Sequence, residues 1–190
     1  MEALLGAARE DAATGSRLGG NPPMVFTGDP LLNTHDYLLT LEANTAPWLD
    51  RDELSVFVRR GYGIGDPDDS YPDIAVSAVL HAPSPRSDSH AAAHPFIASR
   101  ALERVTADPA ASSLIRISDE PLRLQHEASY LAPVRDAGYT FLFSFDEEGF
   151  PVDDDVVSEY QFGYGAVHFF GKFNSHGIAT EIVAGLIENS

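Results

Sequence analysis

The chain has 190 residues, 44% of them hydrophobic, which suffices for one domain with a good core or for two small halves that share one. It has no cysteine, which excludes disulfides, thiolate metal sites and cysteine nucleophiles and makes the cytoplasm the simplest compartment. A formal charge of −17 disfavours direct binding to nucleic acid or anionic membranes and favours basic partners, unless the acids serve only to keep the surface solvated.

The N-terminal region predicts little regular structure. It carries acids early and no continuous apolar run, so it does not resemble a signal peptide, and no stretch of about 20 apolar residues predicts a membrane span. Leu4, Leu5 and Ala8 stand at helical spacing and predict a short helix or a frayed end. After two prolines, residues 24–26 predict a short extended run.

Three strands are expected in the first half of the chain. They cover residues 37–42, 54–58 and 74–80, which are rich in β-branched and aromatic residues. In the first of them, simple alternation places Tyr37, Leu39 and Leu41 on one face and Leu38 and Thr40 on the other. Apolar residues on both faces are typical of a central strand rather than an edge strand.

Residues 81–95 differ in composition from their surroundings, being rich in Ala, Pro, Ser and His, and predict a mobile surface linker. From Pro95, apolar residues at helical spacing up to Val105 predict a helix. Residues 114–117 predict a strand, and residues 130–137 a short helix that Gly138 ends.

The second half ends in three strands, at residues 140–146, 165–173 and 178–187, which repeat the order of the first three. Residues 141–146 match residues 37–42 at an offset of 104, and Pro151 matches Pro47 at the same offset. We therefore predict a β-rich α+β fold in a single domain of residues 1–190. Two pseudo-repeats, about 24–80 and about 114–187, share one core, are joined by the linker at about 81–95, and carry two or three short helices.

The second half resembles the YwqG-like family, a bacterial domain of unknown function. The resemblance lies in four motifs: RISDEPLRLQ (116–125), GYTFLFSFDEEGFP (138–151), FGYGAVHFFGKF (162–173) and EIVAGLI (181–187). It implies a duplicated α+β protein without established catalytic residues, in a family linked with toxin and immunity genes. The turns at residues 28–30 and 118–121 depart from the Gly-Gly-x-Pro pattern of that family.

Two loops have the residue types of an ion or phosphate site, but neither has the required spacing. Asp66, Asp68, Asp69 and Asp73 fail the EF-hand pattern, because Tyr71 and Ser77 occupy the positions that need Gly and Glu. Residues 163–165 (Gly-Tyr-Gly) lack the Lys and Ser or Thr of a phosphate loop, and predict a structural bend instead.

The sequence assigns no catalytic, cofactor or metal residue. His81, His90 and His94 fit no tight metal motif, and His168 within a strand predicts a hydrogen-bonded structural histidine. Gly-x-Ser-x-Gly does not occur. Asp146 and Glu159 are the carboxylate pair considered for acid and base work, at a separation that the sequence does not give.

The candidate partner-binding residues are two aromatics and two acidic loops: Trp48, Phe150, Asp66, Asp68, Asp69, Asp153, Asp154 and Asp155. Trp48 and Phe150 stand beside the matching prolines, where they either line a shared pocket or close the ends of the core. The leading hypothesis is a non-catalytic acidic binding protein, an immunity or inhibitor protein for a basic toxin. The alternatives are a small-molecule-binding or enzymatic domain with a pocket between the repeats, and a nucleic-acid mimic.

Overall fold

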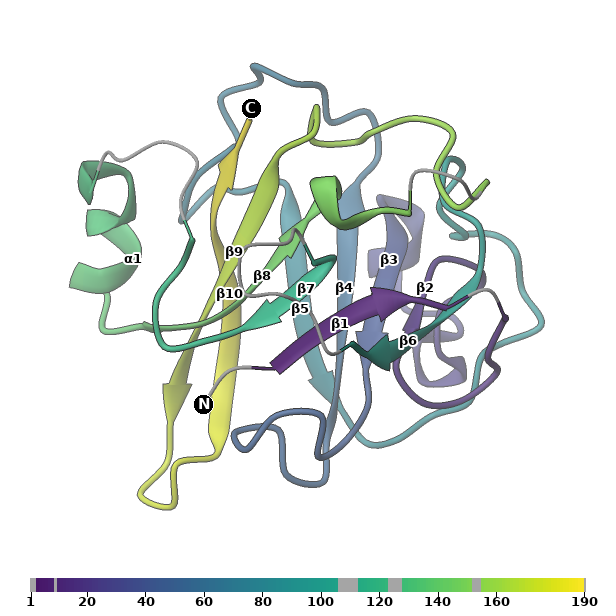
Figure 1. Cartoon of the computed structure of the whole chain (residues 1–190), viewed down its shortest axis with the longest axis horizontal. Helices are drawn as coiled ribbons and strands as arrows, with labels where there is room; N and C mark the ends of the chain where they lie inside the picture. Colours follow the sequence, from purple (N-terminus) through teal and green to yellow (C-terminus); the bar gives the residue numbers. More distant parts are fainter. Residues whose placement is uncertain (1–2, 9, 106–112, 123–127, 152–154, 190) are drawn as a thin grey trace.

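The computed structural model describes residues 3–8, 10–105, 113–122, 128–151 and 155–189 (Figure 1). Within these ranges, ten strands form one antiparallel sheet that is nearly closed on itself. In chain order they are β1 (Ala3–Ala7), β2 (Arg17–Leu18), β3 (His35–Leu41), β4 (Glu53–Arg59), β5 (Val76–His81), β6 (Arg100–Arg104), β7 (Ile115–Ile117), β8 (Thr140–Asp146), β9 (Ala166–Phe173) and β10 (Ala179–Glu188).

The order of the strands across the sheet is symmetric about its middle. It runs β10-β9-β8-β7-β1-β6-β2-β3-β4-β5, so that one meander of four strands, β2 to β5, lies at one end and another, β7 to β10, at the other. β1 and β6 pair with each other in the middle. β1 also pairs with β7 and β6 with β2, so each joins the meander of the other half of the chain.

The two outermost strands, β5 and β10, are linked through the segment that precedes β5. The Tyr71 amide donates to the Gly185 carbonyl at 3.0 Å, and the Ile187 amide donates to the Asp69 carbonyl at 2.7 Å. These bonds satisfy part of the backbone edge of β10, which an open sheet would leave unpaired. The two meanders therefore face each other across a shared interior, as Figure 1 shows.

Both meanders carry a β-bulge at the matching place in their first long strand. The register of β3 against β4 shifts between Tyr37 and Leu39, and that of β8 against β9 shifts between Phe141 and Phe143. The extra residue turns Leu38 into the core together with Leu39, while Tyr37 joins a cluster on the outer face. The alternation expected for residues 37–41 is therefore wrong at its first two positions.

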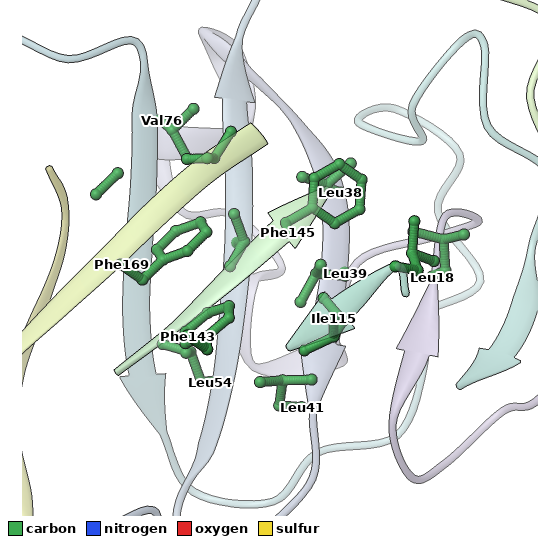
Figure 2. Packing of buried hydrophobic residues seen from close by; sticks show 14 of the residues in the cluster. Leu18, Leu38, Leu39, Leu41, Leu54, Val76, Ile115, Phe143, Phe145 and Phe169 are labelled. Atoms are coloured by element: carbon green, nitrogen blue, oxygen red, sulfur yellow. The ribbon is translucent and has the colours of Figure 1, made fainter. Parts of the chain in front are cut away.

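The largest hydrophobic cluster fills the space between the two meanders (Figure 2). Phe143 of β8 stacks on Phe169 of β9, with ring centroids 4.3 Å apart and planes at 4°. Trp48, from the loop between β3 and β4, lies nearly parallel to Phe143 at 5.9 Å. A side chain from the first half is thus packed against the aromatic centre of the second, which makes the core common to both.

The described ranges also contain short helical segments. They are the 3-10 turns η1 (Met24–Phe26), η2 (Pro30–Asn33), η3 (Ala128–Leu131) and η4 (Glu147–Gly149) and the helix α1 (Ala132–Asp136). The expected helix at residues 130–137 is confirmed, and Gly138 ends it at φ 85°. The β-rich character of the fold is also confirmed. No helix in the described ranges has the length and apolar character needed to cross a membrane.

Three local predictions are wrong. The helices expected at Leu4–Ala8 and from Pro95 are strands β1 and β6, and the extended run at Met24–Phe26 is η1. A few apolar residues fit a period of 3.6 and a period of 2 almost equally well, so pairing decides between them. β1 and β6 pair with each other, and each gains a second neighbour from the opposite meander.

The segment that follows β5 is packed against the first half rather than forming a loose surface linker. Its backbone bonds include Met24 N to Pro85 O at 2.8 Å and Tyr37 N to Ala92 O at 2.8 Å. Ser87 and Ala92 are buried. The mobility predicted from the small side chains is therefore wrong, because small side chains also allow a chain to lie close to a sheet.

Candidate functional site

Each meander carries a row of hydrogen-bonded polar side chains on its outer face. In the second meander, Ser144 Oγ lies 2.7 Å from His168 Nδ1, and His168 Nε2 lies 3.0 Å from Glu188 Oε2. The matching row in the first meander joins Thr40 to Ser55 at 2.7 Å and Ser55 to His81 Nε2 at 2.8 Å. Such rows satisfy polar groups that the sheet removes from water.

The Ser144–His168–Glu188 row has the connectivity of a nucleophile, a base and an orienting acid. However, Ser144 is only 5% exposed and His168 is fully buried. A substrate carbonyl therefore has no path to the Ser144 hydroxyl unless the covering chain opens. The arrangement is a buried network, and the prediction that His168 is hydrogen-bonded within its strand is confirmed.

A more accessible site is a cavity of about 330 Å³ between the loop after β4 and the segment that leads into β9. We call it the junction pocket, because segments from both halves of the chain form its walls. Its lining residues are Asp36, Val58–Ile64, His94–Phe96 and Glu159–Gln161. Its volume is at the lower end of the range for sites that hold a small molecule or a protruding side chain.

The walls of the junction pocket are held together by contacts between segments distant in sequence. The Gln161 side-chain amide donates to the Tyr62 carbonyl at 3.1 Å. On the other side, the Ser158 amide donates to the Phe96 carbonyl at 2.9 Å. Gly163 packs so closely on Ile64 that a Cβ there would meet the Ile64 side chain at 2.6 Å. The pocket is therefore formed before any ligand binds.

The electrostatic character of the junction pocket is neutral to negative. Arg59 pairs with Asp68, and Arg60 pairs with Asp36 at 2.7 Å, so these lining arginines are already neutralised. Burial lowers the pKa of His94 to about 4, which leaves its ring neutral at physiological pH.

The acidic loop at residues 66–69 adds negative potential to the same wall. Burial, and then the charges of Asp69, Asp68 and Asp66, raise the pKa of Tyr62 to about 12. The Tyr62 hydroxyl is buried and has no hydrogen-bond partner among the described residues.

The open edge of the pocket carries apolar side chains in unusual positions. Ile64 is 57% exposed and Tyr164 is 53% exposed. Tyr164 stacks on Tyr160 with ring centroids 4.0 Å apart. Its backbone is left-handed, at φ 62°, a conformation that costs free energy for a residue with a side chain. The fold thus holds Tyr164 in a disfavoured backbone conformation, stacked on Tyr160 of the pocket wall.

A buried carboxylate beneath this edge fixes the loop that carries the tyrosines. Glu147 Oε2 accepts hydrogen bonds from the amides of Phe162 at 3.0 Å and Tyr164 at 3.1 Å. Burial raises the pKa of Glu147 to about 7, while the backbone donors oppose that rise. Its other oxygen is buried without a partner among the described residues. Glu147 is therefore a structural acid that titrates near neutral pH.

Of the predicted acidic residues, Asp66 and Asp68 are held on the wall of the junction pocket through its residues Gly63 and Arg59. Asp69 follows them in the same loop, and Asp155 is exposed and does not line the pocket. Asp153 and Asp154 lie outside the described residues. Within the first loop, Asp66 accepts from the Gly63 amide and Asp68 pairs with Arg59, so both also shape the turn.

The two predicted aromatic residues do not share a pocket. Trp48 lines a second cavity elsewhere, whereas Phe150 is buried and packs on Phe145 and Tyr160. Phe150 therefore supports the junction pocket from beneath. Of the carboxylate pair considered for catalysis, Glu159 lines the pocket and Asp146 does not. No cluster of three metal-ligating side chains occurs in the described part of the chain.

The sequence did not single out the tyrosine pair or the loop at Arg59–Ile64 as functional. The available signal was a tyrosine between two glycines, at residues 163–165, which indicated a bend but not what the bend presents. In comparisons with known proteins, no family model matches this chain and no curated protein is similar to it.

Proposed function

We propose that this protein is a non-catalytic binding protein that takes a basic partner protein at the junction pocket. The single observation that carries the proposal is the surroundings of this pocket, where the lining Glu159 and the acidic loop bonded to Gly63 and Arg59 accompany the stacked pair of Tyr160 and Tyr164. Its biological setting would be that of an immunity or inhibitor protein for a basic toxin in the cytoplasm. The resemblance to the YwqG-like family and the net charge support that setting.

The chemistry of the pocket fits an arginine or lysine side chain of the partner. A guanidinium stacks on tyrosine faces and gains electrostatic energy from the ring. Glu159, which lines the pocket, and Asp66, which is bonded to the lining Gly63 amide, supply negative charge. The exposed Ile64 and Tyr164 add apolar area, as the centre of a protein interface requires. The charge of −17 would steer the basic partner toward this surface and speed the encounter.

Titration calorimetry with a hexa-arginine peptide tests this proposal at two salt concentrations. We expect binding to weaken at least tenfold between about 20 and 300 mM NaCl, because surface charges are screened over a shorter distance at higher salt. The double variant Glu159→Gln with Tyr160→Ala is expected to bind at least about tenfold more weakly. Asp136→Asn removes a comparable charge from α1, outside the pocket, and is the matched control. Equal loss in both variants, or affinity independent of salt, would contradict the proposal.

We also propose that the two meanders descend from one duplicated unit. The symmetric strand order and the bulges at Tyr37 and Phe141, which are 104 residues apart, support this origin. So do the two polar rows. Thr40 faces Ser55 across β3 and β4, and the residue 104 positions after Thr40, Ser144, faces His168 across β8 and β9. Chance likeness of two meanders would not require the polar rows to match as well.

A further inference from the structure

A second cavity, of about 320 Å³, lies between the loop after β3 and the ends of β7, β8 and β9. We call it the Trp48 pocket. Its lining is mostly apolar and comes from both halves of the chain: Pro47, Trp48, Ile117, Phe141, Leu142 and Phe173. A cavity with mainly apolar walls and a few polar groups is the usual form of a small-molecule site.

The indole of Trp48 is held in place from within the protein. It lies nearly parallel to the buried Phe143, with ring centroids 5.9 Å apart and planes at 16°. The Trp48 carbonyl accepts a hydrogen bond from the Ala179 amide at 2.9 Å, which ties the loop to the start of β10. A ligand would therefore meet a wall that is already ordered, and little conformational entropy would be lost on binding.

The one polar group of this indole has no hydrogen bond. Trp48 is only 8% exposed, yet its ring N–H donates to none of the described residues. The ring nitrogen is also not among their polar atoms that are buried without a partner, so it belongs to the small part of the side chain that stays open. A largely buried tryptophan N–H usually has a partner, because an unmade bond costs free energy. The cavity that Trp48 lines is the place from which an acceptor reaches it.

The lining of the Trp48 pocket favours a ligand without charge. None of the described lining residues is basic, and the whole chain carries a charge of −17, so an anion gains no partner and is repelled. Asp119, the one ionisable side chain of this lining, already has an interaction of its own, so it is not a free counter-ion for a cation. The volume suits one aromatic ring with a short tail.

We propose that the Trp48 pocket binds a small neutral aromatic compound with an accepting oxygen, such as an aryl ketone, which takes the hydrogen bond of the Trp48 N–H. The ring of the ligand lies against the apolar walls, where Phe173, 40% exposed in the free protein, loses contact with water. This site shares no lining residue with the junction pocket, so it does not depend on the proposed function.

Trp48 is the only tryptophan of the chain, so its indole N–H gives a single signal in a proton–nitrogen NMR spectrum. The isotope-labelled full-length protein is titrated with three probes: acetophenone, cyclohexyl methyl ketone, which lacks the aromatic ring, and phenylacetate, which adds a charge. We expect acetophenone to move the indole signal downfield in a saturable way, with half-saturation in the millimolar range or below. The other two are expected to bind at least about threefold more weakly, because one lacks the contact between rings and the other buries an unpaired charge.

Two outcomes of this titration would overturn the proposal. One is that acetophenone causes no saturable movement of the indole signal up to about 10 mM. The other is equal affinity for all three probes, because the pocket would then select neither an aromatic ring nor a neutral molecule.

Two variants separate the hydrogen bond from the apolar contact, with binding followed at the backbone amide signal of Gly177, which also lines the pocket. Trp48→Phe keeps an aromatic wall and removes the N–H, so acetophenone is expected to bind about fivefold more weakly. Phe173→Ala removes part of the wall and is expected to weaken acetophenone by a similar factor. Unchanged affinity in either variant would overturn the assignment. Met24→Ala, which shortens a comparably exposed apolar side chain outside both pockets, is the matched control and leaves the affinity unchanged. Circular dichroism checks that each variant folds.

Discussion

Glu147 is a buried acid that supports the proposed binding surface at the junction pocket. Its contribution to the free energy of unfolding depends on pH. It holds the amides of Phe162 and Tyr164, and through them the tyrosine pair at the mouth of the junction pocket. Asp146 and Glu148 are its charged neighbours in sequence, and the charge of Glu147 also raises the pKa of Tyr62. A carboxylate that titrates near neutrality makes this support sensitive to protons.

Replacement of Glu147 by Gln is expected to change the pH dependence of stability. Burial raises the pKa of this carboxyl from 4.5 to about 7, so the folded protein binds the proton more tightly than the unfolded chain. The stabilisation from this group is full below pH 4.5 and is lost as the pH rises to 7, in total about 3 kcal/mol. The Glu147→Gln variant has no carboxyl group at this position, so it does not lose this stabilisation as the pH rises. Urea unfolding at pH 4.5 and pH 8 measures the difference.

The expected outcome is that the wild-type protein loses more unfolding free energy than Glu147→Gln between the two pH values. Glu148→Gln is the matched control, because Glu148 is adjacent and exposed. Its pH dependence is expected to follow that of the wild type. Parallel curves for the wild type and Glu147→Gln would show that the carboxylate is not perturbed by its site.

At the scale of elements, the turn that leads from Phe162 and Tyr164 into β9 depends on Gly165. A Cβ on Gly165 would lie 2.1 Å from the Glu188 carbonyl oxygen and 2.6 Å from that of Phe162. Both atoms belong to the backbone and have no flexible end that can move aside. Gly165→Ala is therefore expected to lower the free energy of unfolding by at least about 2 kcal/mol.

Gly28→Ala is the control for this prediction. Gly28 has a positive φ of 84° but open space around its Cβ position, so alanine there carries only the backbone penalty of about 1 kcal/mol. Chemical denaturation of both variants gives the comparison. Similar losses at the two positions would mean that steric contact with β10 does not limit the loop.

A strand or helix could be predicted where its own residues follow a clear hydrophobic period. It could not be predicted where pairing with neighbouring strands decides its structure. The six long strands follow from β-branched and aromatic runs, and their residues are the walls of the core. β1 and β6 have only five residues each, too few to show a clear period, and they exist as strands because they pair with each other and with β7 and β2. The bulges at Tyr37 and Phe141 arise in the same way, because register is a property of two strands together.

At the scale of the whole molecule, β1 and β6 each pair with the meander of the other half of the chain. This exchange allows the proposed duplication to be tested. A fragment of residues 95–190 contains β6 to β10 but lacks β1, which pairs with β7 in the intact chain. If the halves are equivalent, β6 of one copy can pair with β7 of a second copy, and the reverse. We expect this fragment to form a symmetric dimer.

Light scattering during size-exclusion chromatography measures the mass of the fragment. A folded species of twice the fragment mass is the expected result, and residues 1–94 are expected to behave alike. A folded monomer, or a fragment that stays unfolded at high concentration, would count against the equivalence of the two halves. Loss of the dimer in a fragment that starts after β6 would show that β6 makes the exchange.

The sequence by itself determined the composition of the core, the positions of the long strands, the match of residues 141–146 to residues 37–42 and the acidic character of the chain. These follow from side-chain chemistry and local periodicity, which each stretch carries within itself. The tertiary structure alone decided that the loops at residues 58–64 and 159–161 meet in one pocket, and that Trp48 lines another. A pocket depends on how distant segments approach each other, and that distance is fixed only when the sheet closes around a common core.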